Sequence, residues 1–274
     1  MNQSAYKLNY VFNRQVQPKN ISRSWQDCQV WYGRAGDWGD MTIVEKDISY
    51  CVEYGISGYA IELSKLVSDS FPSWDDNWLK EIAVKYKKLV KMVRAAGMWL
   101  FVTVVNENSN DGFPSFETAM RCAAELVNVI RKNGNSNVIV QPVSERTSNT
   151  GKLFENFCLF ELSNFDLVYG GYSVDVPEGM KYKAIHPSSI TELNPEGSFV
   201  ICDNPKLLEE FGNEEFCRVH ARNAYCKSHA APGISSMFFN CIDVNCPVVC
   251  FYGPVGKMSN KELIQTIGGL VSLP

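Results

Sequence analysis

Residues 137–145 read Asn-Val-Ile-Val-Gln-Pro-Val-Ser-Glu, and this stretch is the most informative part of the chain. The segment is typical of a buried strand, which we place at Val138–Val143. A carboxylate, Glu145, stands just beyond the end of that strand. We therefore predict a strand that carries an acidic side chain at its carboxyl end.

Two similar cycles precede this stretch. Gly58–Leu63 and Met98–Val105 are apolar runs typical of strands, and each follows a segment of helical periodicity, Met41–Tyr54 and Asn77–Ala96. Strands that alternate with helices indicate a parallel sheet. Working residues in such sheets gather at the carboxyl ends of the strands. Glu145 is therefore the strongest candidate for chemistry.

The remainder of the chain extends the same pattern. A helix is expected from Ser115 to Lys132 and another over Lys152–Leu162, and a closing helix over Lys261–Leu270. Further strands are predicted at Gln29–Tyr32, Phe165–Tyr169, Tyr182–Ile185, Phe199–Cys202 and Ser235–Phe239, with Val248–Tyr252 a strand-like run of unassigned place. Eight strands favour a single (β/α)8 TIM barrel, an α/β fold, over residues 28–274. Residues 1–27 are expected to form an N-terminal arm, and a doubly wound open sheet is the alternative fold.

Composition excludes several classes of protein. The chain has 274 residues, of which 45% are hydrophobic, and its net charge is −4. No basic run exceeds two adjacent residues, so no nucleic-acid partner is expected. No apolar run reaches 18 residues, and the first residues lack a signal-peptide core, so we expect neither a membrane span nor an export signal. The expected location is the cytoplasm or a virus particle.

The ten cysteines are spread through predicted core elements, where a free thiol behaves as a small hydrophobic side chain. The tightest group is Cys241, Cys246 and Cys250, and its spacing fits no common zinc knuckle. We expect no metal. The chain also lacks the glycine spacing of dinucleotide sites, a P-loop and a Gly-x-Ser-x-Gly elbow, so no cofactor is expected.

The order of GISGYAIEL (55–63), GMWLFVTVVN (97–106) and NVIVQPVSE (137–145), with helices between them, resembles the first half of a clan A glycoside hydrolase of the cellulase-like family 5 type. The resemblance covers residues 29–145 well and 165–240 loosely. It implies a carbohydrate substrate at the open face of a barrel.

The resemblance also implies site residues. Glu145 matches the acid/base glutamate, although Ser144 replaces the asparagine that usually precedes it. Asp203, just after the run Phe199–Cys202, matches the place of the nucleophile but is one methylene shorter than the usual glutamate. His186 matches a substrate-binding histidine. The simpler structural alternatives are a carboxylate at a helix start for Glu145 and a turn residue for Asp203.

Further candidates for carbohydrate binding come from their positions near strand ends. Glu62 is the one charge in GYAIEL and needs a partner such as Arg34 if it is buried. Asn106 stands at the end of the run Met98–Val105. Aromatic rings stack on sugar faces, and Trp31, Trp38, Trp74 and Tyr172 lie on or near loops that follow strands, two of the four being expected in the core.

Two functions stay open at this point. The first is a glycoside hydrolase in which Glu145 protonates the leaving oxygen while Asp203 attacks the sugar or activates water. The second is a barrel without hydrolysis that serves as a binding or structural module, for example in a phage particle or a cell-surface assembly. Ser144 and Asp203 favour the second function, as does the missing export signal. The N-terminal arm would then provide a contact to an assembly partner or to other copies.

Overall fold

The computed structural model describes residues 30–34, 36–66, 74–107, 115–133, 137–171, 176–180, 182–185, 199–202, 248–253 and 258–271. Its strands are β1 Val30–Arg34, β2 Gly58–Glu62, β3 Trp99–Asn106, β4 Val138–Ser144, β5 Asp166–Tyr169, β6 Tyr182–Ile185, β7 Phe199–Cys202 and β8 Val248–Gly253. Each strand pairs in parallel with the next, and β8 pairs with β1, so the ring of strand pairs is closed.

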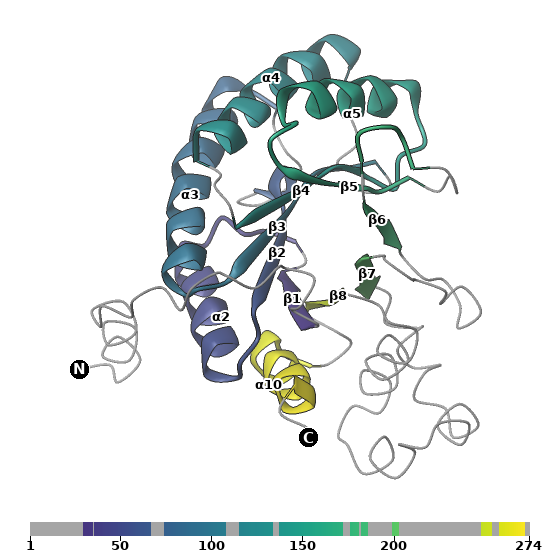
Figure 1. Ribbon diagram of the computed structural model, residues 1–274. Coiled ribbons are helices and arrows are strands. Elements are labelled where there is room, and N and C mark those ends of the chain that lie inside the picture. Colours follow the sequence, from purple (N-terminus) through teal and green to yellow (C-terminus); the bar gives the residue numbers. More distant parts are fainter. Residues whose placement is uncertain are drawn as a thin grey trace.

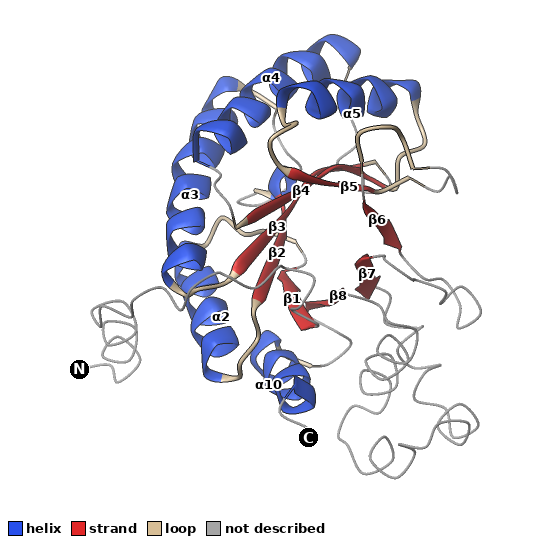
Figure 2. Cartoon of the chain, viewed as in Figure 1, coloured by secondary structure: helices blue, strands red, loops and turns tan. Residues whose placement is uncertain are grey.

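The helices lie on the outer side of this curved sheet (Figures 1 and 2). They are α2 Met41–Glu53, α3 Asp76–Ala95, α4 Phe116–Asn133, α5 Asn149–Glu161 and α10 Asn260–Val271, with a short 3-10 turn at Leu63–Lys65. The fold is thus a curled parallel α/β sheet, as expected. The connections between β5 and β8 lie largely outside the described residues, so the full eightfold alternation stays a prediction, as does the N-terminal arm 1–27.

The eighth strand differs from the one that we expected. It is Val248–Gly253, whereas Ser235–Phe239 lies outside the described residues. All six residues of β8 are buried, and the strand pairs with both β1 and β7. Two apolar runs of similar length look alike in the sequence. Only the pairing that closes the ring shows that the later run takes the place beside β1.

Local side chains determine where the helices begin. Asp40 and Asp75 accept hydrogen bonds from the first turns of α2 and α3, as N-cap residues do. Ser148 accepts from the Gly151 N–H and caps α5. That helix therefore begins at Asn149, three residues before the expected start at Lys152, because the serine satisfies its first turn.

The interior of the ring is filled mainly by apolar side chains, one or more from every strand: Trp31, Ala60, Phe101, Ile139, Val168, Ala184, Ile201, Val248, Cys250 and Tyr252. Trp31 lies over Gly58, where a Cβ would come within 1.9 Å of the indole. A second, larger core lies between the strands and the helices. None of the described helices combines the length and apolarity that crossing a membrane would need.

Polar residues replace this apolar filling toward the carboxyl ends of the strands. Side chains alternate between the two faces of a strand. The residues two positions after Ala60, Phe101 and Ile139 are Glu62, Thr103 and Gln141. The interior thus becomes polar at the end of the sheet where parallel α/β folds hold their sites.

Candidate functional site

Glu145 directly follows β4 and is partly exposed. Its backbone N–H donates a hydrogen bond to the Gly170 carbonyl at 2.8 Å, and Ser144 forms a parallel bridge with Gly170. The φ angle of Glu145 is 51°, in the left-handed region. A residue with a Cβ adopts this conformation at a cost of roughly 1–2 kcal/mol. Such strain persists only where neighbouring contacts impose it, and it concentrates at functional sites.

Arg146, the next residue, turns to the helix side of β4. Its Nε lies 3.0 Å from Glu155 Oε2 on α5, and its Nη2 donates to the Tyr169 hydroxyl at 2.9 Å. The guanidinium also lies over the Tyr169 ring, 5.6 Å from the ring centroid. Glu155 is only 1% exposed. Burial raises the pKa of Glu155 to about 7, against the opposing effect of Arg146.

Glu107, just beyond β3, contacts the loop of residues 145–148 that follows β4. Its carboxylate accepts hydrogen bonds from the N–H and side chain of Ser148 and from Thr147, with the Ser148 N–H at 2.9 Å. Burial opposes the ionisation of Glu107, but the hydrogen bonds from Ser148 and Thr147 outweigh burial and lower its pKa. A Cβ at Gly151 would lie 2.2 Å from this carboxylate, so glycine there makes room for it.

The polar residues at the carboxyl ends of β2, β3 and β4 form two groups of polar contacts. Thr103 Oγ1 donates to Gln141 Oε1 at 2.7 Å. Asn106 Nδ2 donates to Glu62 Oε1 at 3.3 Å, and Lys65 Nζ lies 2.8 Å from Glu62 Oε2. The structure therefore brings together Glu62 and Asn106, both of which the sequence marked as candidates.

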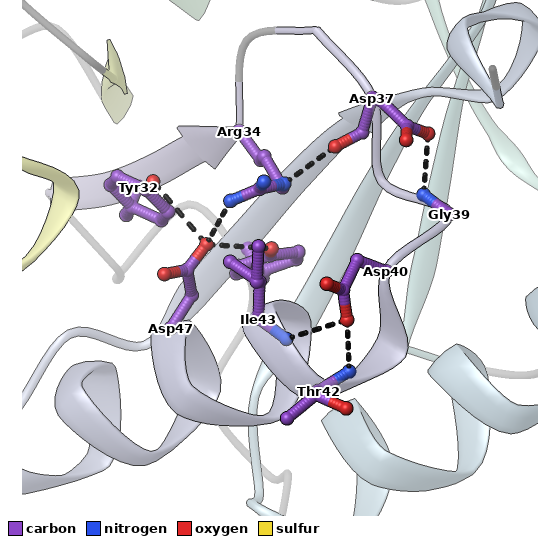
Figure 3. Close-up of polar contacts among 9 residues, drawn as sticks. Tyr32, Arg34, Asp37, Gly39, Asp40, Thr42, Ile43 and Asp47 are labelled. Atoms are coloured by element: carbon purple, nitrogen blue, oxygen red, sulfur yellow. Dashed lines mark hydrogen bonds and ion pairs between the residues drawn. The ribbon is translucent and has the colours of Figure 1, made fainter. Parts of the chain in front are cut away.

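Glu62 has a cation beside it, as expected, but this cation is Lys65 and not Arg34, the example that we named. Arg34 Nη1 instead lies 2.8 Å from Asp47 Oδ2 on α2 (Figure 3). The hydroxyls of Tyr32 and Tyr59 also point to Asp47, at 3.5 and 3.4 Å. Burial raises the pKa of Asp47 although Arg34 opposes the shift. This cluster ties β1 and β2 to α2 on the helix side, so Arg34 is held away from Glu62.

The other candidates divide into two groups. Trp31 and Trp38 are fully buried, and Trp38 Nε1 donates to the Leu63 carbonyl at 3.2 Å. Trp74 is buried as well. These three rings therefore pack in the core and offer no face for stacking. Asp203, His186 and Tyr172 lie outside the described residues. Asp203 follows β7 in the chain, and His186 follows β6.

Sequence reasoning missed Arg146 and Glu155. A usable signal was present, because Glu155 stands among the buried residues of α5, at a position where a helix normally presents an apolar side chain. A charge in such a stripe requires a partner. Lys152, on the same helix, and Arg146, three residues before it, are both close enough in sequence to provide one, and the structure places Arg146 against the carboxylate.

Within the described part of the chain, no group of three or more His, Cys, Asp or Glu residues is arranged to hold a metal ion. Cys51, Cys122, Cys158 and Cys250 are buried. Burial raises the pKa of the Cys51, Cys122 and Cys158 thiols, which keeps them protonated and unreactive. Cys241 and Cys246 lie outside the described residues.

No family model matches the sequence, and no curated protein matches it. Among solved structures, an endo-1,4-β-D-mannanase from Thermotoga petrophila RKU-1 is similar at 12% identity over 82% of this chain and 94% of that chain, with a TM-score of 0.44. An endo-β-N-acetylglucosaminidase from Cordyceps militaris shows 9% identity over 97% of this chain and 95% of that chain, with a TM-score of 0.48. A β-mannanase from the blue mussel Mytilus edulis shows 8% identity over 88% and 90%, with a TM-score of 0.43. Identities and TM-scores as low as these do not assign the chain to a family or give it an activity.

Proposed function

We propose that this chain completes a (β/α)8 barrel and acts on a carbohydrate at the carboxyl end of its strands, as a glycoside hydrolase does. The observation that carries the proposal is the position of Glu145. It directly follows β4, has a left-handed backbone, and is followed by residues that contact α5, β5 and Glu107 just beyond β3. Strained residues on a rigid support are typical of catalytic positions.

In this function, Glu145 protonates the oxygen of the leaving sugar. A second carboxylate must act from the other side of the bond, and Asp203 after β7 is our candidate. In the order of strands, β4 and β7 are separated by β5 and β6 on one side and by four strands on the other. A gap between the carboxyl groups of about 5–5.5 Å would support retention, and about 6.5–9.5 Å would support inversion.

Sugar hydroxyls would bind the polar residues that end the neighbouring strands. Glu62 and Asn106 already share a hydrogen bond at 3.3 Å, and Lys65 neutralises the Glu62 carboxylate. Such a group offers both donors and acceptors, as hydroxyl recognition requires. We place His186 and Tyr172 in the same role because they follow β6 and β5 in the chain.

A panel of soluble polysaccharides with chromogenic labels tests the proposal. The wild-type protein is compared with Glu145→Gln, which keeps the shape of the side chain but cannot give a proton. Glu53→Gln is the matched control, because Glu53 is exposed at the end of α2 that leads into β2, at the opposite end of the strands. Turnover by the wild type and the control, lost at least about a hundredfold in Glu145→Gln, supports the proposal.

Other outcomes separate the alternatives. Binding of a polysaccharide without release of label would support a binding or structural module, which the short Asp203 and the replacement of asparagine by Ser144 favour. Equal turnover by the wild type and Glu145→Gln would remove Glu145 from the chemistry. Neither binding nor turnover across the panel would contradict a carbohydrate function.

A further inference from the structure

The left-handed backbone at Glu145 requires contacts on both sides to hold it. On the N-terminal side, the Glu145 N–H donates to Gly170 at 2.8 Å. A Cβ at Gly170 would lie 2.3 Å from the Val143 carbonyl, so the two strands approach this closely only because residue 170 is glycine. This side is therefore held by backbone contacts between β4 and the residue after β5.

On the C-terminal side, the holding contacts come from the side chain of Arg146. One guanidinium nitrogen pairs with Glu155 on α5, a second donates to the Tyr169 hydroxyl on β5, and the guanidinium carbon lies 5.6 Å from the centroid of the Tyr169 ring. The Arg146 side chain is 19% exposed and that of Glu155 is 2% exposed. A long side chain held at three points in a buried setting has little rotamer freedom, so it transmits its position to the backbone.

Among the residues that the structure describes, two other charged groups act on this pair. Glu155 is also influenced by Glu107, which repels it, and by Lys152 on its own helix, which attracts it. Glu107 is occupied with the N–H groups of residues 147 and 148. Lys152 is exposed. Arg146 is therefore the cation that contacts the buried Glu155 carboxylate within the described residues.

We propose that Arg146 is a positioning residue for Glu145. By holding position 146 against α5 and β5, it keeps the preceding residue in its left-handed conformation and so directs the Glu145 carboxylate at the substrate. This inference rests on the function proposed above, but the positioning itself can be measured without a substrate. Arg146 does not touch the reacting atoms in this scheme.

The experiment compares Arg146→Met with Arg146→Lys, which keeps the charge but cannot contact Glu155 and Tyr169 through two separate nitrogens. The double variant Arg146→Met/Glu155→Gln removes the buried charge as well and guards against unfolding caused by an unpaired carboxylate. Arg131→Met is the matched control, because Arg131 pairs with the other end of α5, at Glu161, on the exposed surface. Amide hydrogen exchange is followed by mass spectrometry in peptides that cover residues 144–148.

We expect exchange in that segment to rise about tenfold in Arg146→Met and in the double variant, less in Arg146→Lys, and not in Arg131→Met, with α3 unchanged throughout. On the substrate that the panel identifies, kcat should fall about tenfold while KM stays within about twofold, with partial rescue by lysine. A general structural role would instead raise exchange in α3 and α5 together.

Each result decides one proposal. Unchanged exchange in residues 144–148 of the double variant would overturn the positioning role. Increased exchange there, in a protein that neither binds nor hydrolyses any polysaccharide, would support the positioning role of Arg146 and contradict the carbohydrate function. Increased exchange with unchanged kcat would show that the orientation of Glu145 does not limit catalysis and would overturn the inference as stated.

Discussion

Arg146 donates a hydrogen bond to the Tyr169 hydroxyl at 2.9 Å and also lies over the ring of the same tyrosine, 5.6 Å from its centroid. One side chain thus contacts both the polar and the apolar part of its partner. Because Tyr169 ends β5 and Arg146 follows β4, this relationship links two neighbouring strand ends beside the candidate site. Glu155 completes the link from the helix side.

The buried Glu155 should make stability depend on pH. Its pKa is about 7 in the folded chain against 4.5 as its ordinary value, so the folded protein binds the proton more tightly. The contribution of the protonated Glu155 carboxyl to the free energy of unfolding is fully present below about pH 4.5 and is lost as the pH rises through 7. Relative to Glu155→Gln, the free energy of unfolding of the wild type should fall by roughly 2–3 kcal/mol from pH 5 to pH 8. Urea unfolding at both values measures this difference, and parallel curves for the two proteins would contradict it.

The Arg34–Asp47 pair should be costly to break. Asp47→Asn leaves the Arg34 guanidinium mostly buried without its counter-charge, which typically costs about 3–5 kcal/mol. The control is Glu45→Gln on the same helix, because the Glu45–Lys88 pair is much more exposed and should contribute less than about 1 kcal/mol. Chemical denaturation of both variants measures the difference, and a similar small effect in both would show that Asp47 is not a structural partner.

Gly170 should not tolerate a side chain. In Gly170→Ala, the new Cβ would lie 2.3 Å from the Val143 carbonyl and 2.4 Å from Gln141 Nε2, so β4 and β5 must separate. We expect a loss of about 1–3 kcal/mol. Gly269→Ala is the opposite case, because position 269 lies in α10 and a Cβ added there would meet no atom within 4 Å, so alanine should stabilise that helix by about 0.5–1 kcal/mol. Thermal unfolding of the two variants should therefore shift in opposite directions.

The backbone of Glu145 can be examined separately from its carboxylate. Glu145→Ala and Glu145→Gly both remove the acid, but only glycine adopts a φ of 51° without a steric cost. At most positions the alanine variant is the more stable one, because glycine gains more entropy on unfolding. Here the order should be reversed, with glycine more stable by about 0.5–1 kcal/mol. A more stable alanine variant would show that position 145 relaxes out of the left-handed region.

Much of the architecture could be predicted because it depends on local patterns. Apolar runs separated by helical periodicity located β2, β3 and β4 to within two residues at each end. The eighth strand was misplaced because two apolar runs compete for one position, and only pairing with both β1 and β7 distinguishes them. The partner of Arg34 was misjudged for a similar reason. Several carboxylates lie close in sequence, and packing alone selects Asp47.

The alternation of strands and helices through β5, and a carboxylate at the end of β4, follow from the amino-acid sequence alone, because hydrophobic periodicity is a property of neighbouring residues. The ring closure through β8, the left-handed turn at Glu145 and the joining of Arg146, Tyr169 and Glu155 were decided only by the tertiary structure. Those features depend on contacts between residues far apart in the chain, and packing and desolvation assign each buried charge to one partner.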